Sequence, residues 1–196
     1  MIATEVTDLF PDSLPPAKPA PPAGASTAPV SVRTGVFSPC RLYRYTLTRV
    51  WDAARPLCNF VGLNPSTATE TLDDPTIRRC MGFARRDGAG GLIMTNLFAF
   101  RATNPKDMIA EEEPVGHDNN EHILAAAKAS FYTVLACGAH GAHRGRLAAV
   151  AVMLRSNGVE LLCLGTTESG MPLHPLYLKS ETEFRIFEFI QEVRKK

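Results

Sequence analysis

The pattern of apolar positions along the chain predicts five short β-strands. Residues 41–51 alternate polar and apolar side chains, which is typical of a strand buried on one face. The four other predicted strands are nearly continuous apolar runs, which are typical of strands buried on both faces: Leu57–Leu63, Gly91–Leu97, Tyr132–Cys137 and Glu160–Leu164.

Helical segments alternate with these strands, and residues that favour helix ends mark them. Asp73 and Asp74 precede Pro75, which gives an N-cap with proline in the first turn, and Asn157-Gly158 is a typical helix stop. The predicted helices are Pro75–Arg86, Asp118–Ala129, His143–Asn157 and Ser180–Arg194, the last beginning with a capping box at Ser180 and Glu183. Because strands that alternate with helices pair in parallel, we expect a three-layer α/β/α sandwich with a mostly parallel sheet of four or five strands.

The first 34 residues differ in composition from the rest of the chain. Seven of the 15 prolines lie between Pro11 and Pro29, among Ala, Ser, Thr and Gly. Repeated prolines remove backbone donors and favour an extended, solvated chain. We therefore expect a disordered Pro/Ala-rich tail over residues 1–34 and a single folded domain over residues 35–196.

Composition and charge argue against several classes of protein. The chain has 21 Lys and Arg against 20 Asp and Glu, so its net charge of +1 gives no general attraction to nucleic acids or membranes. Its apolar runs are strand-sized, shorter than the roughly 20 residues that cross a bilayer, and no secretory signal is evident. Its five cysteines are scattered without a C-x-x-C pair, which argues against a disulfide scaffold. We expect a cytoplasmic monomer that has no cofactor or metal and does not bind membranes.

Ligands of parallel sheets bind at the carboxyl ends of the strands, so the loops after Leu63, Leu97 and Leu164 are the candidate sites. In the first loop, Gly62 lets the backbone approach a ligand closely. Asn64 then leaves the strand end with an amide that can hold a water or a hydroxyl, and Pro65 stiffens the turn. Alone, this segment is equally consistent with an ordinary turn, because Asn-Pro is a common turn dipeptide.

The second and third loops offer further hydrogen-bonding groups. Asn96 falls at the end of a buried strand, Phe98 can stack on a flat base, and Arg101 can meet a phosphate. The alternative is that Asn96 caps a turn and the phenylalanine belongs to the core. The third loop is long and contains His174, a potential donor to a developing anion, or else a surface histidine before a proline.

Taken together, these segments resemble the uracil-DNA glycosylase superfamily. Gly62-Leu63-Asn64-Pro65 is similar to the Asn version of its first motif, as in mismatch-type members, and His174-Pro175 resembles its second motif. Thr95-Asn96, followed by Phe98 and Arg101, is similar to the strand-end Asn segment of its bacterial thermostable branch. A closer resemblance, over roughly residues 37–189, is to a bacterial and phage family known as domain of unknown function 1643. It rests on Gly62–Ala68, Asp74-Pro75-Thr76 and Arg78.

The resemblance to glycosylases implies an enzyme that hydrolyses an N-glycosidic bond in DNA or a nucleotide, with a modified pyrimidine as one possible base. Asn64 would position the attacking water, and Asn96 would read the Watson–Crick edge of the base. His174 would hydrogen-bond the base carbonyl as negative charge grows on the leaving base. Phe98 would stack on the base, and Gly62 and Pro65 would complete its binding site.

Some features depart from the glycosylase pattern and leave alternatives open. Leu176-Tyr177 follows Pro175 directly, without the usual serine, so we do not expect this loop to insert into a duplex. One alternative function is a non-catalytic module that binds a base in nucleic acid or a nucleotide. Another is a nucleotide-processing enzyme with an anion site at the Gly138 loop, where Arg144 would bind phosphate. Arg78 is a further candidate phosphate ligand, although local pairing with Asp74 is its simpler explanation.

A final candidate is a metal site at Cys137-x-x-His140-x-x-His143. Three ligands of this type can hold a catalytic zinc, but no fourth ligand is evident and glycines flank the segment. We therefore do not expect a metal there.

Overall fold

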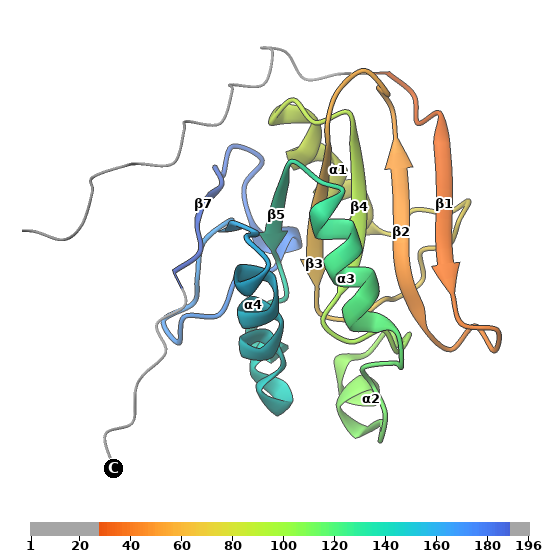
Figure 1. Ribbon diagram of the computed structural model, residues 1–196, viewed down its shortest axis with the longest axis vertical. Coiled ribbons are helices and arrows are strands. Elements are labelled where there is room, and N and C mark those ends of the chain that lie inside the picture. The colour runs from red at the N-terminus through yellow and green to blue at the C-terminus, as the bar shows by residue number, and fades with distance from the viewer. Residues whose placement is uncertain (1–27, 189–196) are drawn as a thin grey trace, which may run out of the picture.

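The computed structural model of the protein describes residues 28–188, which form a single seven-stranded mixed sheet in the order β1-β2-β4-β3-β5-β6-β7 (Figure 1). The strands are β1 (Val32–Phe37), β2 (Arg44–Val50), β3 (Leu57–Gly62), β4 (Gly91–Asn96), β5 (Tyr132–Leu135), β6 (Leu161–Cys163) and β7 (Arg185–Ile186). The central strands β4, β3, β5 and β6 pair in parallel, and the outer pairs β1·β2, β2·β4 and β6·β7 are antiparallel. The expected α/β architecture is therefore present, but the sheet is larger and more mixed than the sequence pattern predicts.

The helices cover both faces of this sheet (Figure 1). They are α1 (Pro75–Arg86), α2 (Pro105–Ala110), α3 (Asn119–Lys128) and α4 (Arg146–Ser156), with short 3₁₀ helices η1 (Ala139–Gly145) and η2 (Pro175–Tyr177). Helix α1 packs on one face, where its apolar side chains join one core cluster. Helices α3 and α4 pack on the other face and contribute to a second cluster.

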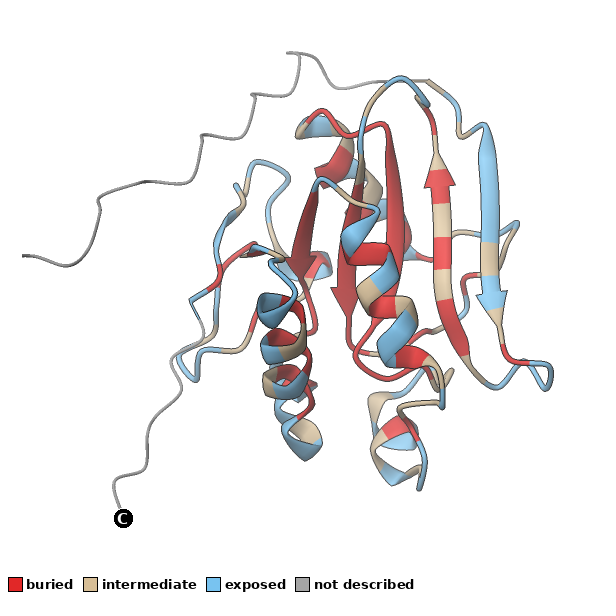
Figure 2. Cartoon of the chain, viewed as in Figure 1, coloured by how far each residue is buried: buried red, intermediate tan, exposed pale blue. Residues whose placement is uncertain are grey.

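The burial of each strand explains its sequence pattern. All residues of β4 and β5 are buried, and so is all of β3 beyond Leu57 (Figure 2). A strand covered by helices on both faces needs apolar residues at every position, which is why these strands are continuous apolar runs. Strand β2 alternates buried and partly buried positions along most of its length, as expected of a strand covered on one face, but the buried positions include Arg44 and Arg49, whereas Val50 is only partly buried.

Two predicted segments differ in the structure. Strand β1 begins at Val32, inside the segment expected to be a tail, and residues 1–27 lie outside the described part of the chain. The helix predicted over residues 180–194 is absent from its described part, since a turn at residues 180–181 is followed by a non-helical segment that contains β7. The physical reason is that Phe184 packs against one core cluster whereas Phe187 is buried in the other. A helix would place these two side chains on the same face, whereas an extended edge segment can send them to opposite faces.

None of the helices between residues 28 and 188 is long and apolar enough to cross a membrane.

Candidate functional site

A cavity of about 340 Å³ lies at the carboxyl ends of β3 and β4. Asn64, Asn96 and His174 all line it: Asn64 and His174 lie in loops, and Asn96 is the last residue of β4. The residues around it are Arg44, Gly62, Leu63, Asn64, Ser66, Thr67, Asp74, Pro75, Thr76, Ile77, Met94, Asn96, Ala102, Thr103, His174 and Leu176. The parallel pairing of β3 and β4 explains why Asn64 and Asn96 meet, because their strands end side by side, with Gly62 opposite Asn96.

The side-chain amide of Asn64 is held in one orientation. Its Nδ2 donates to the carbonyl oxygen of Ala102 at 2.7 Å and to that of Pro65 at 3.1 Å. A flipped amide would place its oxygen against these two carbonyls, so the network fixes which atom is which. Oδ1 has no hydrogen-bond partner within residues 28–188, and Asn64 therefore offers the cavity an acceptor.

The side-chain amide of Asn96 is held in the opposite sense to that of Asn64, through its oxygen rather than its nitrogen. It is buried, and its Oδ1 accepts a hydrogen bond from Arg44 Nη2 at 3.2 Å. Its Nδ2 has no partner in the described part of the chain. A Cβ added to Gly62 would stand 2.7 Å from this nitrogen, so the missing side chain at Gly62 opens the space beside it. Asn96 therefore offers the cavity an amide donor, as well as the second lone pair of its oxygen.

Arg44 is a cavity residue that the sequence pattern does not reveal. Its side chain is buried, and it donates through Nη1 to the carbonyl of Ala68 and through Nη2 to Asn96. Burial lowers the pKa of Arg44 to about 10, although the negative charge of Asp74 acts in the opposite direction. Arg44 therefore remains a cation at neutral pH and places a positive charge in the cavity wall. Its Nε has no hydrogen-bond partner among the described residues.

Asp74 is the one carboxylate among the residues that line the cavity. It is only 9% exposed, and its Oδ1 accepts a hydrogen bond from the backbone N–H of Ile77 at 2.8 Å. The sequence predicts this N-cap correctly. What it does not reveal is that the other carboxylate oxygen, which is unpaired within residues 28–188, belongs to a residue in the wall of the cavity.

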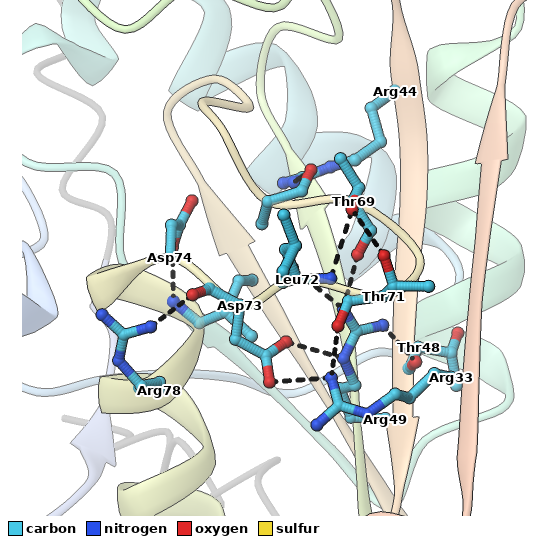
Figure 3. A network of polar contacts seen from close by, with 12 residues as sticks. Arg33, Arg44, Thr48, Arg49, Thr69, Thr71, Leu72, Asp73, Asp74 and Arg78 are labelled. Carbon is cyan, nitrogen blue, oxygen red and sulfur yellow. Dashed lines mark hydrogen bonds and ion pairs between the residues drawn. The ribbon is translucent and has the colours of Figure 1, made fainter.

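The loop before Asp74 is held by arginines from the two antiparallel strands (Figure 3). Arg49 of β2 donates to Asp73, and so does Arg33 of β1. Arg49 also donates to the carbonyls of Thr69 and Leu72. These contacts fix the course of the chain into α1 and thereby the position of Asp74.

His174 is partly buried and presents a neutral imidazole. Its Nδ1 accepts a hydrogen bond from the backbone N–H of Leu176 at 3.3 Å, so the proton of the neutral ring is on Nε2. Burial lowers the pKa of His174 below its ordinary value of 6.5, and the charge of Asp74 opposes this shift only in part. Nε2–H has no partner within the described residues and can serve as a donor.

Two residues predicted to bind the base do not line the cavity. Phe98 is fully buried in the core beside His143, with 5.6 Å between the ring centroids. It therefore has no exposed face on which a base could stack. Pro65 is also buried, and its carbonyl accepts from Asn64 and from the backbone N–H of Ala102, so it shapes the loop from outside the cavity.

The three arginines predicted to bind phosphate lie in different places. Arg101 borders a second hollow next to the cavity. Arg78 donates to the backbone carbonyl of Asp73 at the start of α1. Arg144 donates to the carbonyls of Glu111 and Glu112, both at 2.8 Å, and lines neither hollow.

The loop that begins at Gly138 forms η1. Within residues 28–188, no group of three or more His, Cys, Asp or Glu side chains is arranged to hold a metal ion. Cys137 is buried, and burial raises the pKa of its thiol to about 12.

A family model described as "Protein of unknown function (DUF1643)" matches residues 44–176, which is more than half of the chain. The chain belongs to this family. The DUF1643 match begins at Arg44 and ends at Leu176, the first and last residues that line the cavity, so the whole cavity lies within it. No curated protein and no solved structure was found to match the chain.

Proposed function

We propose that this DUF1643 protein binds a nucleobase in the cavity and hydrolyses the N-glycosidic bond that joins the base to its sugar in DNA or a nucleotide. The main support is the convergence of Asn64, Asn96 and His174 on one cavity of about 340 Å³. Each of the three keeps a hydrogen-bonding atom that is unpaired among residues 28–188, and each has another polar atom in a hydrogen bond that orients its side chain. Small-molecule sites combine a pocket of this size with a few fixed polar groups.

The fixed amide of Asn96 suits a pyrimidine with a carbonyl at position 4. Nδ2 would donate to that carbonyl, and Oδ1 would accept from the neighbouring ring N–H through its second lone pair. Cytosine presents the opposite pattern of donors and acceptors along this edge. Arg44 disfavours the flipped amide, because Nδ2 would then face the guanidinium. A uracil- or thymine-like base is therefore the best match.

The remaining groups suit the chemistry of base release. Asn64 Oδ1 would accept a hydrogen bond from the attacking water, and the unpaired oxygen of Asp74 would take the proton that the water loses. The water oxygen forms a bond to C1′ of the sugar while the glycosidic bond from C1′ to the base breaks. The electron pair of the glycosidic bond leaves with the base. His174 Nε2–H would donate to the base oxygen on which negative charge grows. An amide cannot accept the proton, so we assign this role to the carboxylate that lines the same cavity as Asn64.

The alternative with an anion site at the Gly138 loop has less support. Its key side chain, Arg144, donates to two backbone carbonyls outside the cavity. A non-catalytic base-binding module would use the same cavity and differs only in lacking turnover.

Base release separates these possibilities. The protein is incubated with single-stranded and duplex oligonucleotides that contain uracil or modified pyrimidines, and with the corresponding nucleotides, and the free base is measured by chromatography. We expect Asn64→Ala to abolish release while substrate still binds. Asn157→Ala removes an exposed amide at the end of α4 and should leave release unchanged. Persistent binding without any release by the unaltered protein would instead favour the non-catalytic module.

A further inference from the structure

We infer that the hollow beside the cavity is a phosphate subsite formed by Arg41 and Arg101, so that the substrate is a nucleotide unit rather than a nucleoside. This inference rests on the proposed function. The hollow has a volume of about 390 Å³. It is lined by Arg41, Leu42, Ser66, Thr67, Arg101 and Thr103, together with Ala102.

The hollow is continuous with the base-binding cavity. Ser66, Thr67, Ala102 and Thr103 line both. A base in the cavity has its sugar at the mouth, and the phosphates of a nucleotide are attached to that sugar. The hollow therefore lies where a phosphate next to the base would fall, and it supplies hydroxyl donors in addition to two guanidinium groups.

Phe37 brings the two guanidinium groups together. The Cζ atom of Arg41 lies 4.1 Å from the centroid of the Phe37 ring, and that of Arg101 lies 5.4 Å from it. Arg101 also donates through Nη1 to the backbone carbonyl of Arg41 at 3.1 Å. Arg41 itself has a φ of 58°, in the left-handed region that disfavours residues other than glycine. Arg41 at the tip of the β1–β2 hairpin and Arg101 from the loop after β4 thus contact the same ring, and the backbone of Arg41 pays some conformational cost for this position.

Arg101 is the better phosphate ligand of the two. Arg41 pairs with both carboxylate oxygens of Glu70, at 3.0 and 3.1 Å, so a phosphate must compete for it. Arg101 has no carboxylate partner within the described residues, and its one side-chain hydrogen bond there runs from Nη1 to the carbonyl of Arg41, so Nη2 keeps its N–H groups free. A guanidinium with free N–H groups matches the geometry of a phosphate and can bind it through two hydrogen bonds.

Binding measurements on the full chain test the subsite directly. The probes are thymidine, thymidine 3′,5′-bisphosphate and inorganic phosphate, measured by titration calorimetry. We expect the bisphosphate to bind at least about tenfold more tightly than thymidine. Arg101→Gln should remove most of this advantage without changing the Kd for thymidine, and Arg101→Lys should keep part of it, because a lysine retains the charge but not the planar fork.

Arg55→Gln is the matched control, because Arg55 pairs with Asp52 in the loop before β3, at the opposite end of that strand from the cavity. It should change neither Kd. Equal affinity of the unaltered protein for thymidine and the bisphosphate, absence of binding to either, or an equal loss of both in Arg101→Gln would overturn the subsite.

The outcomes also separate the subsite from the proposed function. If the bisphosphate binds in an Arg101-dependent way and no base is ever released, the subsite stands and the glycosidic activity fails. If base is released equally well from nucleosides and nucleotides, and Arg101→Gln affects neither, the activity stands and the subsite fails.

Discussion

Arg49 Nε donates to Asp73 Oδ1 at 2.8 Å, and this ion pair joins the buried side of β2 to the residue that precedes the N-cap of α1 (Figure 3). The Arg49 side chain is completely buried, and that of Asp73 is 12% exposed. Since Asp74 is the next residue in the chain, the pair fixes the position of the cavity's carboxylate. The antiparallel strand β2 therefore helps to build the site as well as to extend the sheet.

Asp73→Ala should be strongly destabilising. It leaves the charge of Arg49 buried without a carboxylate, and breaking a buried pair in this way typically costs about 3–5 kcal/mol. Urea denaturation measures the free energy of unfolding. The control is Asp52→Ala, which breaks the more exposed pair with Arg55 and should cost about 1 kcal/mol or less. Similar small losses in both variants would contradict the positioning role of Arg49.

Gly62→Ala should impair ligand binding more than stability. The added Cβ would stand 2.6 Å from Met94 Cε and 2.7 Å from Asn96 Nδ2, so the amide that faces the ligand must move. We expect the Kd for a bound nucleotide to rise about tenfold or more, a change equivalent to about 1.4 kcal/mol. Gly82→Ala is the control, because a Cβ at Gly82 meets nothing within 4 Å. That variant should bind normally and be more stable by up to about 1 kcal/mol, since alanine is the better helix former.

His174 should titrate below pH 6.5. Burial lowers its pKa, whereas the pKa of His117 is raised by its hydrogen bond to Asp118, so the two rings should titrate on opposite sides of the ordinary value. NMR titration of the two imidazoles measures this order directly. A His174 ring that titrates above pH 6.5 would contradict the neutral donor.

The shift at His174 also has a consequence for stability. Because the unfolded chain binds this proton more readily than the folded protein, stability is full above pH 6.5 and falls as the pH drops through 6.5 towards the lower folded pKa. His174→Gln should remove this part of the pH dependence, which thermal unfolding between pH 7.5 and 5.5 would show.

The sequence predicts the central part of the fold and the three loops that meet at the cavity. Continuous apolar runs identify β3, β4 and β5 because those strands are covered on both faces, and parallel pairing then places Asn64 near Asn96. β1 was not predicted, since its residues are mostly exposed and show little apolar alternation. The helix predicted after residue 180 is wrong because the spacing of Phe184 and Phe187 fits one face of a helix as well as it fits an extended segment that contacts both core clusters.

Local sequence does not determine which polar residues face the cavity. Arg44 lies in an alternating strand, and only the three-dimensional contact with Asn96 shows what it does. Phe98 has the aromatic ring expected of a stacking residue, but its side chain is fully buried in the core cluster to which α3 and α4 contribute. The sequence predicts Asp74 as an N-cap, but it does not show that the residue lines the same cavity with one carboxylate oxygen unpaired among residues 28–188.

Asp74→Asn should separate the two roles of Asp74, which are to cap helix α1 and to accept a proton from the attacking water. Asparagine caps helices about as well as aspartate, so the hydrogen bond to Ile77 N–H can persist and α1 can form. The amide cannot take a proton from water, and loss of a general base typically slows a reaction by about 10²–10⁴-fold. We therefore expect the rate constant for base release to fall by this factor while the Kd for nucleotide changes little, as measured by single-turnover assays and calorimetry.

Asp118→Asn is the control, because it changes a carboxylate at the N-cap position of α3, outside the cavity, and should release base at the normal rate. A normal rate in Asp74→Asn would show that another group accepts the proton, and a loss confined to Kd would assign Asp74 to binding instead.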